Sequence, residues 1–191
     1  ILSVFVFIHC AFAQNSNVRE TESEPFVSVN VSDDFVMKLI PADTCKVRTI
    51  VDERLDQYVQ ASVQNGVLYI TVDRKSIPSD LKKSLRVKGA PLPVLEAEVY
   101  LPSLKSLEMS GNAVLSKTDV LYSDSFSLTL TDKARVEKIY VDCKTAEINL
   151  SKTAFADVEM KAAEELFVIT SNSSKAVVKQ TGKVLKVDAA G

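Results

Sequence analysis

Apolar and polar residues alternate along most of this chain, and in its second half the alternation recurs at a regular interval. Each repeat has an alternating apolar start, a Ser or Thr, two polar or turn residues, and then Ala or Ser. The first residues of successive repeats lie 21, 20 and 20 positions apart. Alternation with a period of two predicts short strands that bury one face. The four repeats are Leu107–Leu115, Leu128–Val136, Ile148–Ala156 and Val168–Ala176.

A repeat of about 20 residues built from short strands and corners predicts an all-β solenoid, in which successive coils pair at about 4.8 Å. The polar triplets turn the corners, where a Ser or Thr side chain can hydrogen-bond local backbone. Thr, Val, Ser and Asn fill these segments without a 3.6-residue stripe, which argues against helices. The side chains expected to point inward are Leu107, Met109, Ala113, Leu115, Leu128, Leu130, Ala134, Val136, Ile148, Leu150, Ala154, Ala156, Val168, Thr170, Ser174 and Ala176.

Strand signals also precede the repeats. Phe26–Val31 and Phe35–Ile40 alternate on either side of the turn residues 32–34, so we expect them to pair as a hairpin. Lys46–Val51 is expected to form a third strand, and Val94–Leu101 a strand that leads into the repeats.

A second hairpin is predicted within Tyr58–Asp73. Two alternating stretches there flank the dipeptide Asn65-Gly66. Asn-Gly readily takes the positive φ values that a type I′ turn requires. The solenoid is therefore expected to be preceded by N-terminal β-hairpins.

Residues 74–93 form a basic insertion between strands. They include six cationic residues and one acid, and three prolines interrupt any regular element. One interpretation is a loop that binds an acidic polymer, such as an acidic glycan or the phosphates of lipopolysaccharide. The other is a solvated insertion that Leu81 and Leu85 attach to the body through one short helix. The candidate ligand-binding residues in the insertion are Lys75, Lys82, Lys83, Arg86 and Lys88.

The first 13 residues have the features of a secretory signal peptide. They are apolar, end in Ala11-Phe12-Ala13, and are too short to span a bilayer. They contain neither an initiator Met nor a basic start, so we expect the given sequence to begin inside the signal peptide. Soluble export is the simpler expectation, and a lipid anchor on Cys10 is the alternative.

The rest of the chain is expected to form one domain. Residues 14–25 are polar and predict a flexible leader. Residues 26–191 then form a single head domain, with the repeats over residues 103–191. Leu185–Gly191 resembles the opening of a fifth repeat, so we expect the repeats to continue beyond the last residue given.

Composition excludes several classes of function. The chain has 191 residues, 46% apolar and 25% charged, with a net charge of −2, so it lacks the basic footprint of nucleic-acid binding. Cleavage after Ala13 would remove His9, the only histidine, which excludes histidine-based catalysis and zinc sites. The turn aspartates do not match a calcium loop, and we expect no metal or cofactor. Cys45 and Cys143 are left either as a disulfide or as two free thiols.

Several segments together resemble the head GIN domain family of putative autotransporter adhesins, exported β-rich proteins of Bacteroidetes. The resemblance covers residues 26–191 and rests above all on Leu101–Gly111, LPSLKSLEMSG. Further matches are Phe35–Leu39, Val47–Asp52 before Leu55, and Asn65–Ile70. The resemblance implies a right-handed β-helix-like fold and a location in the periplasm or at the cell surface. It carries over no catalytic residues.

Three functions follow as alternatives. The first is a non-catalytic adhesion or binding module, whose outward residues Glu108, Thr129, Asn149 and Ile169 form a face for a glycan or protein. The second is a structural module that self-associates through coil edges. The third is an enzyme that cleaves polysaccharides with paired carboxylates. We favour the first, with no nucleic-acid partner and no transmembrane segment after signal cleavage. The candidate acids for the third are Asp132, Asp142, Glu147 and Asp157.

Overall fold

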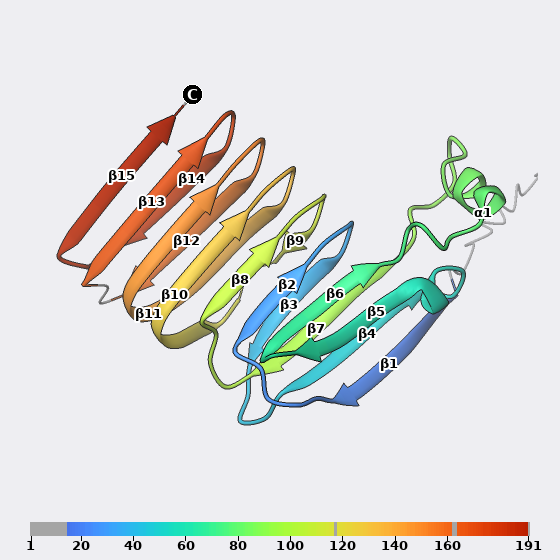
Figure 1. Ribbon diagram of the computed structural model, residues 1–191, viewed down its shortest axis with the longest axis horizontal. Helices are drawn as coiled ribbons and strands as arrows, with labels where there is room; N and C mark the ends of the chain where they lie inside the picture. Colours follow the sequence, from blue (N-terminus) through green and yellow to red (C-terminus); the bar gives the residue numbers. More distant parts are fainter. Residues whose placement is uncertain (1–14, 117, 162–163, 191) are drawn as a thin grey trace, which may run out of the picture.

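A computed structural model describes residues 15–116, 118–161 and 164–190 of the chain. The expected signal peptide, residues 1–13, lies outside the described residues. The described part contains fifteen strands, one short α-helix and one 3-10 turn (Figure 1). The strands wind into a solenoid of about four turns, with coils about 20 residues apart. The all-β solenoid predicted from the repeats is therefore confirmed.

Two walls of strands enclose the core. The first wall runs in the order β6, β2, β8, β10, β11, β13, β15, and every neighbouring pair in it is parallel. It ends on one side with the antiparallel strand β5. The strands are β5 (Val59–Gln64), β6 (Val67–Val72), β2 (Ser28–Val31), β8 (Ser106–Met109), β10 (Val120–Leu130), β11 (Arg135–Leu150), β13 (Glu165–Ser171) and β15 (Val184–Ala190).

The second wall lies opposite and runs in the order β7, β3, β9, β11, β12, β14, again all parallel. The antiparallel strands β4 and β1 extend it beyond β7. The long strands β10 and β11 continue round the side of the coil, so β11 contributes to both walls. The strands not yet given are β1 (Ser16–Glu22), β3 (Val36–Pro41), β4 (Lys46–Asp52), β7 (Leu95–Leu101), β9 (Val114–Leu115), β12 (Phe155–Lys161) and β14 (Lys175–Gln180).

The core consists of inward side chains stacked coil upon coil. Leu107, Leu128, Ile148 and Val168 are direct register partners in the first wall, and none is more than 3% exposed. Burial of such a ladder supplies the main stabilisation of the fold, at about 25 cal/mol per Å² of apolar surface. The inward residues predicted for the first three repeats are all buried. In the fourth, Val168 is buried, whereas Thr170, Ser174 and Ala176 are only half-buried.

The corners between the walls share one backbone conformation. The middle residue of each corner has a positive φ, between 57° and 70°. Backbone hydrogen bonds join each corner to the next, for example from Asn112 N–H to the Asp33 carbonyl at 2.8 Å. Asn and Asp tolerate this left-handed region better than most residues, and glycine adopts it freely. The corner residues with positive φ are Asp33, Gly111, Asp132, Lys152 and Asn172.

The hairpin predicted between Phe26–Val31 and Phe35–Ile40 is wrong. The strands that form there, β2 and β3, lie in opposite walls and pair with other strands. Residues 32–35 between them are the first corner of the solenoid. Alternation with a polar turn is common to hairpins and coil corners, so the local pattern did not distinguish them.

The second hairpin is confirmed. Strands β5 and β6 pair antiparallel, with Val63 opposite Leu68. Asn65 and Gly66 both have positive φ, 52° and 75°, as a type I′ turn requires.

The flexible leader expected at residues 14–25 is also corrected, because residues 16–22 form β1. All seven residues of β1 are exposed, and the strand pairs antiparallel with β4. Backbone hydrogen bonds and polar contacts hold β1 against β4. The strand has no buried apolar face, so its sequence shows no alternation of apolar and polar residues.

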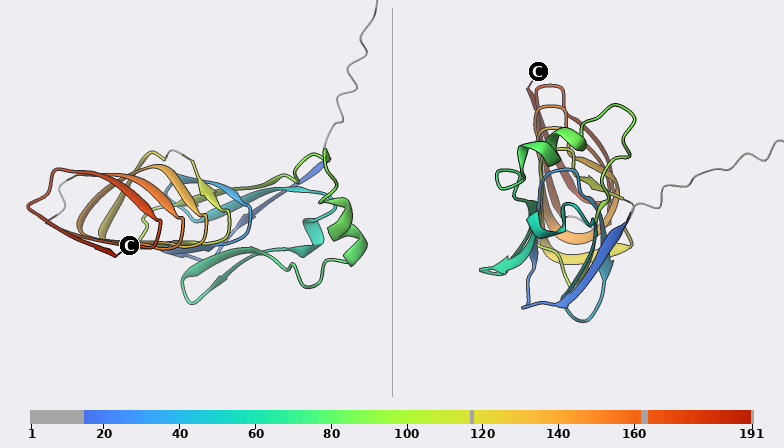
Figure 2. Two further views of the ribbon diagram at one scale, coloured as in Figure 1. Left: turned by 90° about the horizontal axis from the view of Figure 1, so that it is seen from above. Right: turned by 90° about the vertical axis from the view of Figure 1, so that its right-hand side faces the viewer.

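The basic insertion contains α1 (Ser79–Ser84), after β6 and before β7. Leu81 and Leu85 pack partly buried against the core, as the second interpretation of the insertion predicted. The 3-10 turn η1 (Asp56–Tyr58) lies at the same end of the solenoid, which is opposite to β15 (Figure 1, Figure 2). No helix in the described part of the chain has the length and apolar character needed to cross a bilayer. Cys45 and Cys143 are free thiols.

Candidate functional site

The outer face of the first wall carries polar side chains in rows, which we call the ladder surface. One row consists of the register partners Asn30, Glu108, Thr129, Asn149 and Ile169. Four of these are the outward residues expected from the sequence, and the structure brings them together in one line. Successive strands lie about 4.8 Å apart, so the row presents hydrogen-bonding groups at that repeat.

Contacts within the ladder surface hold its side chains in place. Asn30 Nδ2 donates to Glu108 Oε2 at 2.7 Å, and Asn149 Nδ2 donates to Glu147 Oε1 at 2.8 Å. Towards β15 the surface becomes more apolar, because Phe167 and Ile169 are 37% and 42% exposed. The polar part is therefore a flat array of hydroxyl, amide and carboxylate groups.

The outer face of the second wall is different, because its charges are paired across strands. Arg48 Nη1 lies 2.8 Å from Glu98 Oε2, and its hydrogen bond is the main reason that the pKa of Glu98 is lowered. Further along, Lys138 Nζ lies 2.7 Å from Asp157 Oδ1 and 3.5 Å from Glu159 Oε2. Exposed pairs of this kind contribute little individually to stability. They neutralise the paired charges of this wall without a convergent charged site.

Two of the four candidate acids for catalysis are held in ion pairs with lysines. Asp157 is bound to Lys138, and Asp132 is bound to Lys152 at 2.5 Å. The hydrogen bond from Lys152 lowers the pKa of Asp132. A general acid in glycoside hydrolysis needs a raised pKa. In the described residues, every carboxyl with a clearly shifted pKa shifts downward, namely Asp33, Asp73, Glu98, Asp124, Asp132 and Glu159.

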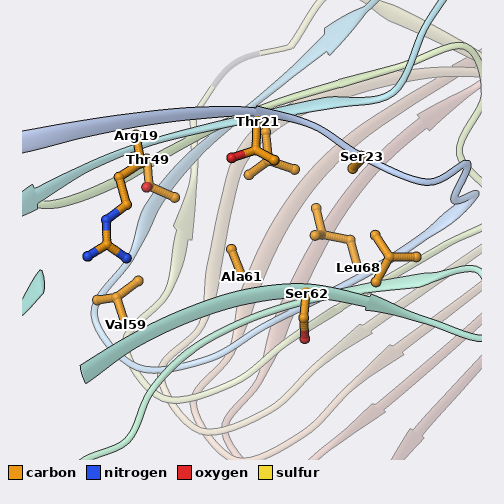
Figure 3. Close-up of a pocket in the computed structure, with 10 residues that line it drawn as sticks. Arg19, Thr21, Ser23, Thr49, Val59, Ala61, Ser62 and Leu68 are labelled. Atoms are coloured by element: carbon orange, nitrogen blue, oxygen red, sulfur yellow. The ribbon is translucent and has the colours of Figure 1, made fainter. Parts of the chain in front are cut away.

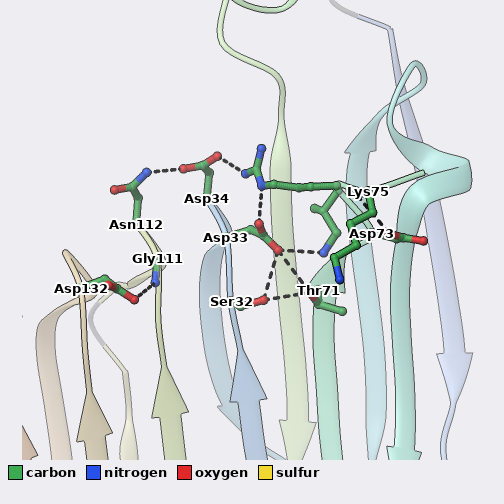
Figure 4. Close-up of polar contacts among 11 residues, drawn as sticks. Ser32, Asp33, Asp34, Thr71, Asp73, Lys75, Gly111, Asn112 and Asp132 are labelled. Carbon is green, nitrogen blue, oxygen red and sulfur yellow. Dashed lines mark hydrogen bonds and ion pairs between the residues drawn. The ribbon is translucent and has the colours of Figure 1, made fainter. Parts of the chain in front are cut away.

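The first corner holds a network of polar contacts (Figure 4). Asp33 accepts hydrogen bonds from Val72 N–H at 2.9 Å, from the hydroxyl of Thr71 at 3.2 Å, and from Arg74 Nε. Burial alone would raise the pKa of Asp33, but the bonds from Val72 and Arg74 outweigh it and lower the pKa. Arg74 also contacts Asp34 at 2.5 Å. The network ties the basic insertion to the solenoid.

No pattern in the sequence indicates this network, although its two sides each carry a local signal. The Asp-Asp pair at residues 33–34 was assigned to a hairpin turn, and Arg74 to the basic insertion. Asp34 and Arg74 are 40 positions apart in the sequence, and they meet only because β2 pairs with β6.

The candidate residues of the basic insertion do not converge on one point. Lys82 and Arg86 line the same cavity, together with Arg74. Lys75 lies beside Asp73 in a shallow depression on the other side of Arg74. Lys83 faces Asp80 at 3.8 Å, and Lys88 is exposed. Of the five candidates, Lys82 and Arg86 therefore line one cavity together.

A separate groove opens between the edge strands β1 and β5 (Figure 3). It has a volume of about 170 Å³ and is lined by Thr21 of β1, by Val47 and Thr49 of β4, and by Val, Ala and Ser side chains of β5. Arg19 lies at one end, where its Nη2 pairs with Asp56 Oδ2 at 2.6 Å. This groove is the open end of the core, where no further coil covers the inward side chains of β4 and β6.

The fold and its surfaces define the chain as a β-solenoid with cross-strand ion pairs on one wall and a polar, flat surface on the other. A sequence profile described as "Putative auto-transporter adhesin, head GIN domain" matches residues 25–191. The chain belongs to this family. The resemblance found in the sequence is thereby confirmed. No curated protein sequence matches this chain.

Several solved structures resemble this chain. A putative adhesin from Bacteroides fragilis is 11% identical, with a TM-score of 0.51 over 94% of this chain and 95% of that chain. A putative adhesin from Parabacteroides merdae is 14% identical, with a TM-score of 0.41 over 93% and 96% of the two chains. A putative lipid binding protein from Parabacteroides distasonis is 15% identical, with a TM-score of 0.41 over 92% and 98%. At such identities the likeness concerns the fold alone.

Proposed function

We propose that this protein is a non-catalytic module of the cell envelope that binds an extended glycan or a protein through the ladder surface. The observation that carries the proposal is the register of Asn30, Glu108, Thr129 and Asn149 on adjacent coils. Polar groups at a fixed spacing on a rigid wall suit an extended ligand, because little conformational entropy is lost on binding. Membership of the adhesin family supports both the binding role and export to the periplasm or cell surface.

The contacts of the carboxyls on the ladder surface support a binding role over catalysis. The carboxyls on the ladder surface, Glu108 and Glu147, each accept a hydrogen bond from an Asn of the same surface. Such groups orient a ligand through hydrogen bonds and are not arranged to transfer a proton to it. The ligand is therefore expected to leave the protein chemically unchanged.

A glycan array probed with the full chain tests the proposal, followed by titration of any saturable hit. Thr129→Arg and Asn149→Arg place bulky cations on the ladder surface and should each weaken binding at least tenfold. Val177→Arg is the matched control, because Val177 is 42% exposed on the opposite wall. Binding that survives both changes on the ladder surface but is lost in Val177→Arg would contradict the proposed face.

Self-association through strand edges is a second candidate. Among the described residues, four strands have a partner on one side only, namely β1, β5, β14 and β15, and Val187 on β15 is 63% exposed. Unpaired strand edges with apolar side chains readily pair with another chain. Sedimentation at increasing protein concentration distinguishes the two functions. Concentration-dependent oligomers without ligand, together with a blank array, would favour assembly.

A further inference from the structure

A cavity of about 250 Å³ lies beneath the basic insertion, at the end of the solenoid that carries α1. Its floor consists of Leu55, Val72, Ile77 and Leu95, which belong to the hydrophobic core and are 3% to 6% exposed. Leu85 of the insertion lines the side. Pockets that hold small molecules are mostly apolar and contain a few polar groups that fix the orientation of the ligand.

The polar groups at this cavity are mainly cationic. Arg74, Lys82 and Arg86 line it together with a single acid, Asp34. Asp34 is already engaged, since its carboxylate contacts Arg74 at 2.5 Å and accepts a hydrogen bond from Asn112 at 2.6 Å. Burial would lower the pKa of Arg74, but the hydrogen bonds to Asp33 and Asp34 raise it, so its charge is fixed and compensated.

Lys82 and Arg86 differ from Arg74 because neither forms an ion pair with a carboxylate in the described part of the chain. Lys82 is moreover half-buried. Partial burial of a cation costs free energy of desolvation unless an anion or a hydrogen-bond acceptor lies next to it. Two unpaired cations beside an apolar floor therefore supply both parts of a site for a ligand that is anionic at one end and apolar at the other.

The cavity also has an exposed apolar residue in its lining. Leu92 lines the cavity and is 84% exposed, and it is followed in the sequence by Pro93, which lines the cavity as well. Exposed large apolar side chains next to a pocket mark ligand-binding surfaces more often than isolated ones do. A hydrocarbon chain that enters the cavity would gain contact with Leu92.

We propose that the cavity beneath α1 binds a small anionic amphiphile, with a carboxylate or phosphate head at Lys82 and Arg86 and a hydrocarbon chain on the apolar floor. This site is separate from the ladder surface and goes beyond the function proposed above. The head would form charge-assisted hydrogen bonds with the two cations, and the chain would bury apolar surface.

Calorimetric titration of the full chain with short amphiphiles below their micelle concentration tests the site. Decanoate and decyl phosphate should bind with 1:1 stoichiometry, and binding should weaken as salt is added. Decanol, which lacks the charge, should bind at least tenfold more weakly. Acetate and inorganic phosphate, which lack the chain, should also bind at least tenfold more weakly.

Substitutions within the insertion provide a matched pair. The double variant Lys82→Gln, Arg86→Gln should weaken decanoate binding at least tenfold. The double variant Lys75→Gln, Lys88→Gln removes the same charge from the same insertion, away from the cavity, and should leave binding unchanged. Thermal unfolding of each variant establishes that it is folded before titration.

Three results would overturn the proposal. Equal weakening by both double variants would mean that the insertion attracts anions by its overall charge. Equal affinity for decanol and decanoate would show that Lys82 and Arg86 do not contribute to binding. Equal affinity for inorganic phosphate and decyl phosphate would show a plain anion site without a place for the chain. The outcome does not depend on the glycan array, because the ladder surface is intact in both double variants.

Discussion

The corner at Gly111 allows a direct test of how closely adjacent coils approach. Gly111 has a φ of 70°, and a Cβ atom placed on it would lie 2.9 Å from the carbonyl oxygen of Asp33. The same Cβ would lie 3.0 Å and 3.1 Å from the backbone N and Cα of Asp33. These are backbone atoms of the adjacent corner and cannot rotate away. Gly111→Ala should therefore strain both corners.

Two effects determine the size of the destabilisation. An L residue in the left-handed region costs about 1–2 kcal/mol relative to its preferred conformations. Forcing a packed neighbour to shift adds about 1–3 kcal/mol. The free energy of unfolding should thus fall by about 2–5 kcal/mol, a large part of the roughly 5–15 kcal/mol typical of a domain.

Urea denaturation followed by far-UV circular dichroism measures this loss, since the chain has no Trp for fluorescence. Lys152→Ala is the control, because Lys152 has a φ of 61° at the equivalent corner and already carries a Cβ. Its only expected cost is the exposed ion pair with Asp132, about 0–1 kcal/mol. A Gly111→Ala variant within about 0.5 kcal/mol of the parent would refute the close approach of the two corners.

Three further measurements examine the core, the corner network and the thiols. Ile148→Ala should lower the free energy of unfolding by about 2–5 kcal/mol because Ile148 is fully buried; a loss below about 1 kcal/mol would contradict the inward register. The pKa of Asp33 is lowered in the folded chain, so its stabilisation is present above the unfolded pKa of about 3.9 and is lost as pH falls through the folded value. Asp33→Asn should flatten the pH dependence of stability below about pH 4, and an unchanged dependence would contradict the network. Burial, reinforced by the charge of Asp142, raises the pKa of Cys143 to about 11. At pH 8, iodoacetamide should therefore modify Cys45 before Cys143. Mass spectrometry that finds a disulfide between them, or faster labelling of Cys143, would contradict this prediction.

The sequence predicted those parts of the fold in which each strand carries its own signal. Leu128 and Ile148 alternate with polar residues at a fixed interval, and the interval alone placed them in register. The Asn65-Gly66 turn was likewise predicted by two residues with a specific backbone preference.

The parts that were missed depend on which strands meet. Strand β1 is exposed on both faces, so it has no alternation that could distinguish it from a flexible segment. The sequence around Asp33 is equally typical of a hairpin turn, and only the pairing of β2 with β6 and β8 distinguishes the corner from a hairpin. Lys82 and Arg86 line one cavity because of the way α1 and the residues after it lie on the core, which no spacing in the sequence encodes.

The placement of the two candidate sites follows from how a solenoid is built. Within the stack, neighbouring coils in the same register cover both sides of side chains such as Leu128, which leaves flat outer rows as the available surface. At the end with β1, β5 and α1, antiparallel strands and an insertion replace the next coil. The spaces of about 170 and 250 Å³ lie at this end. The flat rows suit large extended ligands and these spaces suit small ones, so substitutions at Thr129 and at Lys82 should affect different ligands independently.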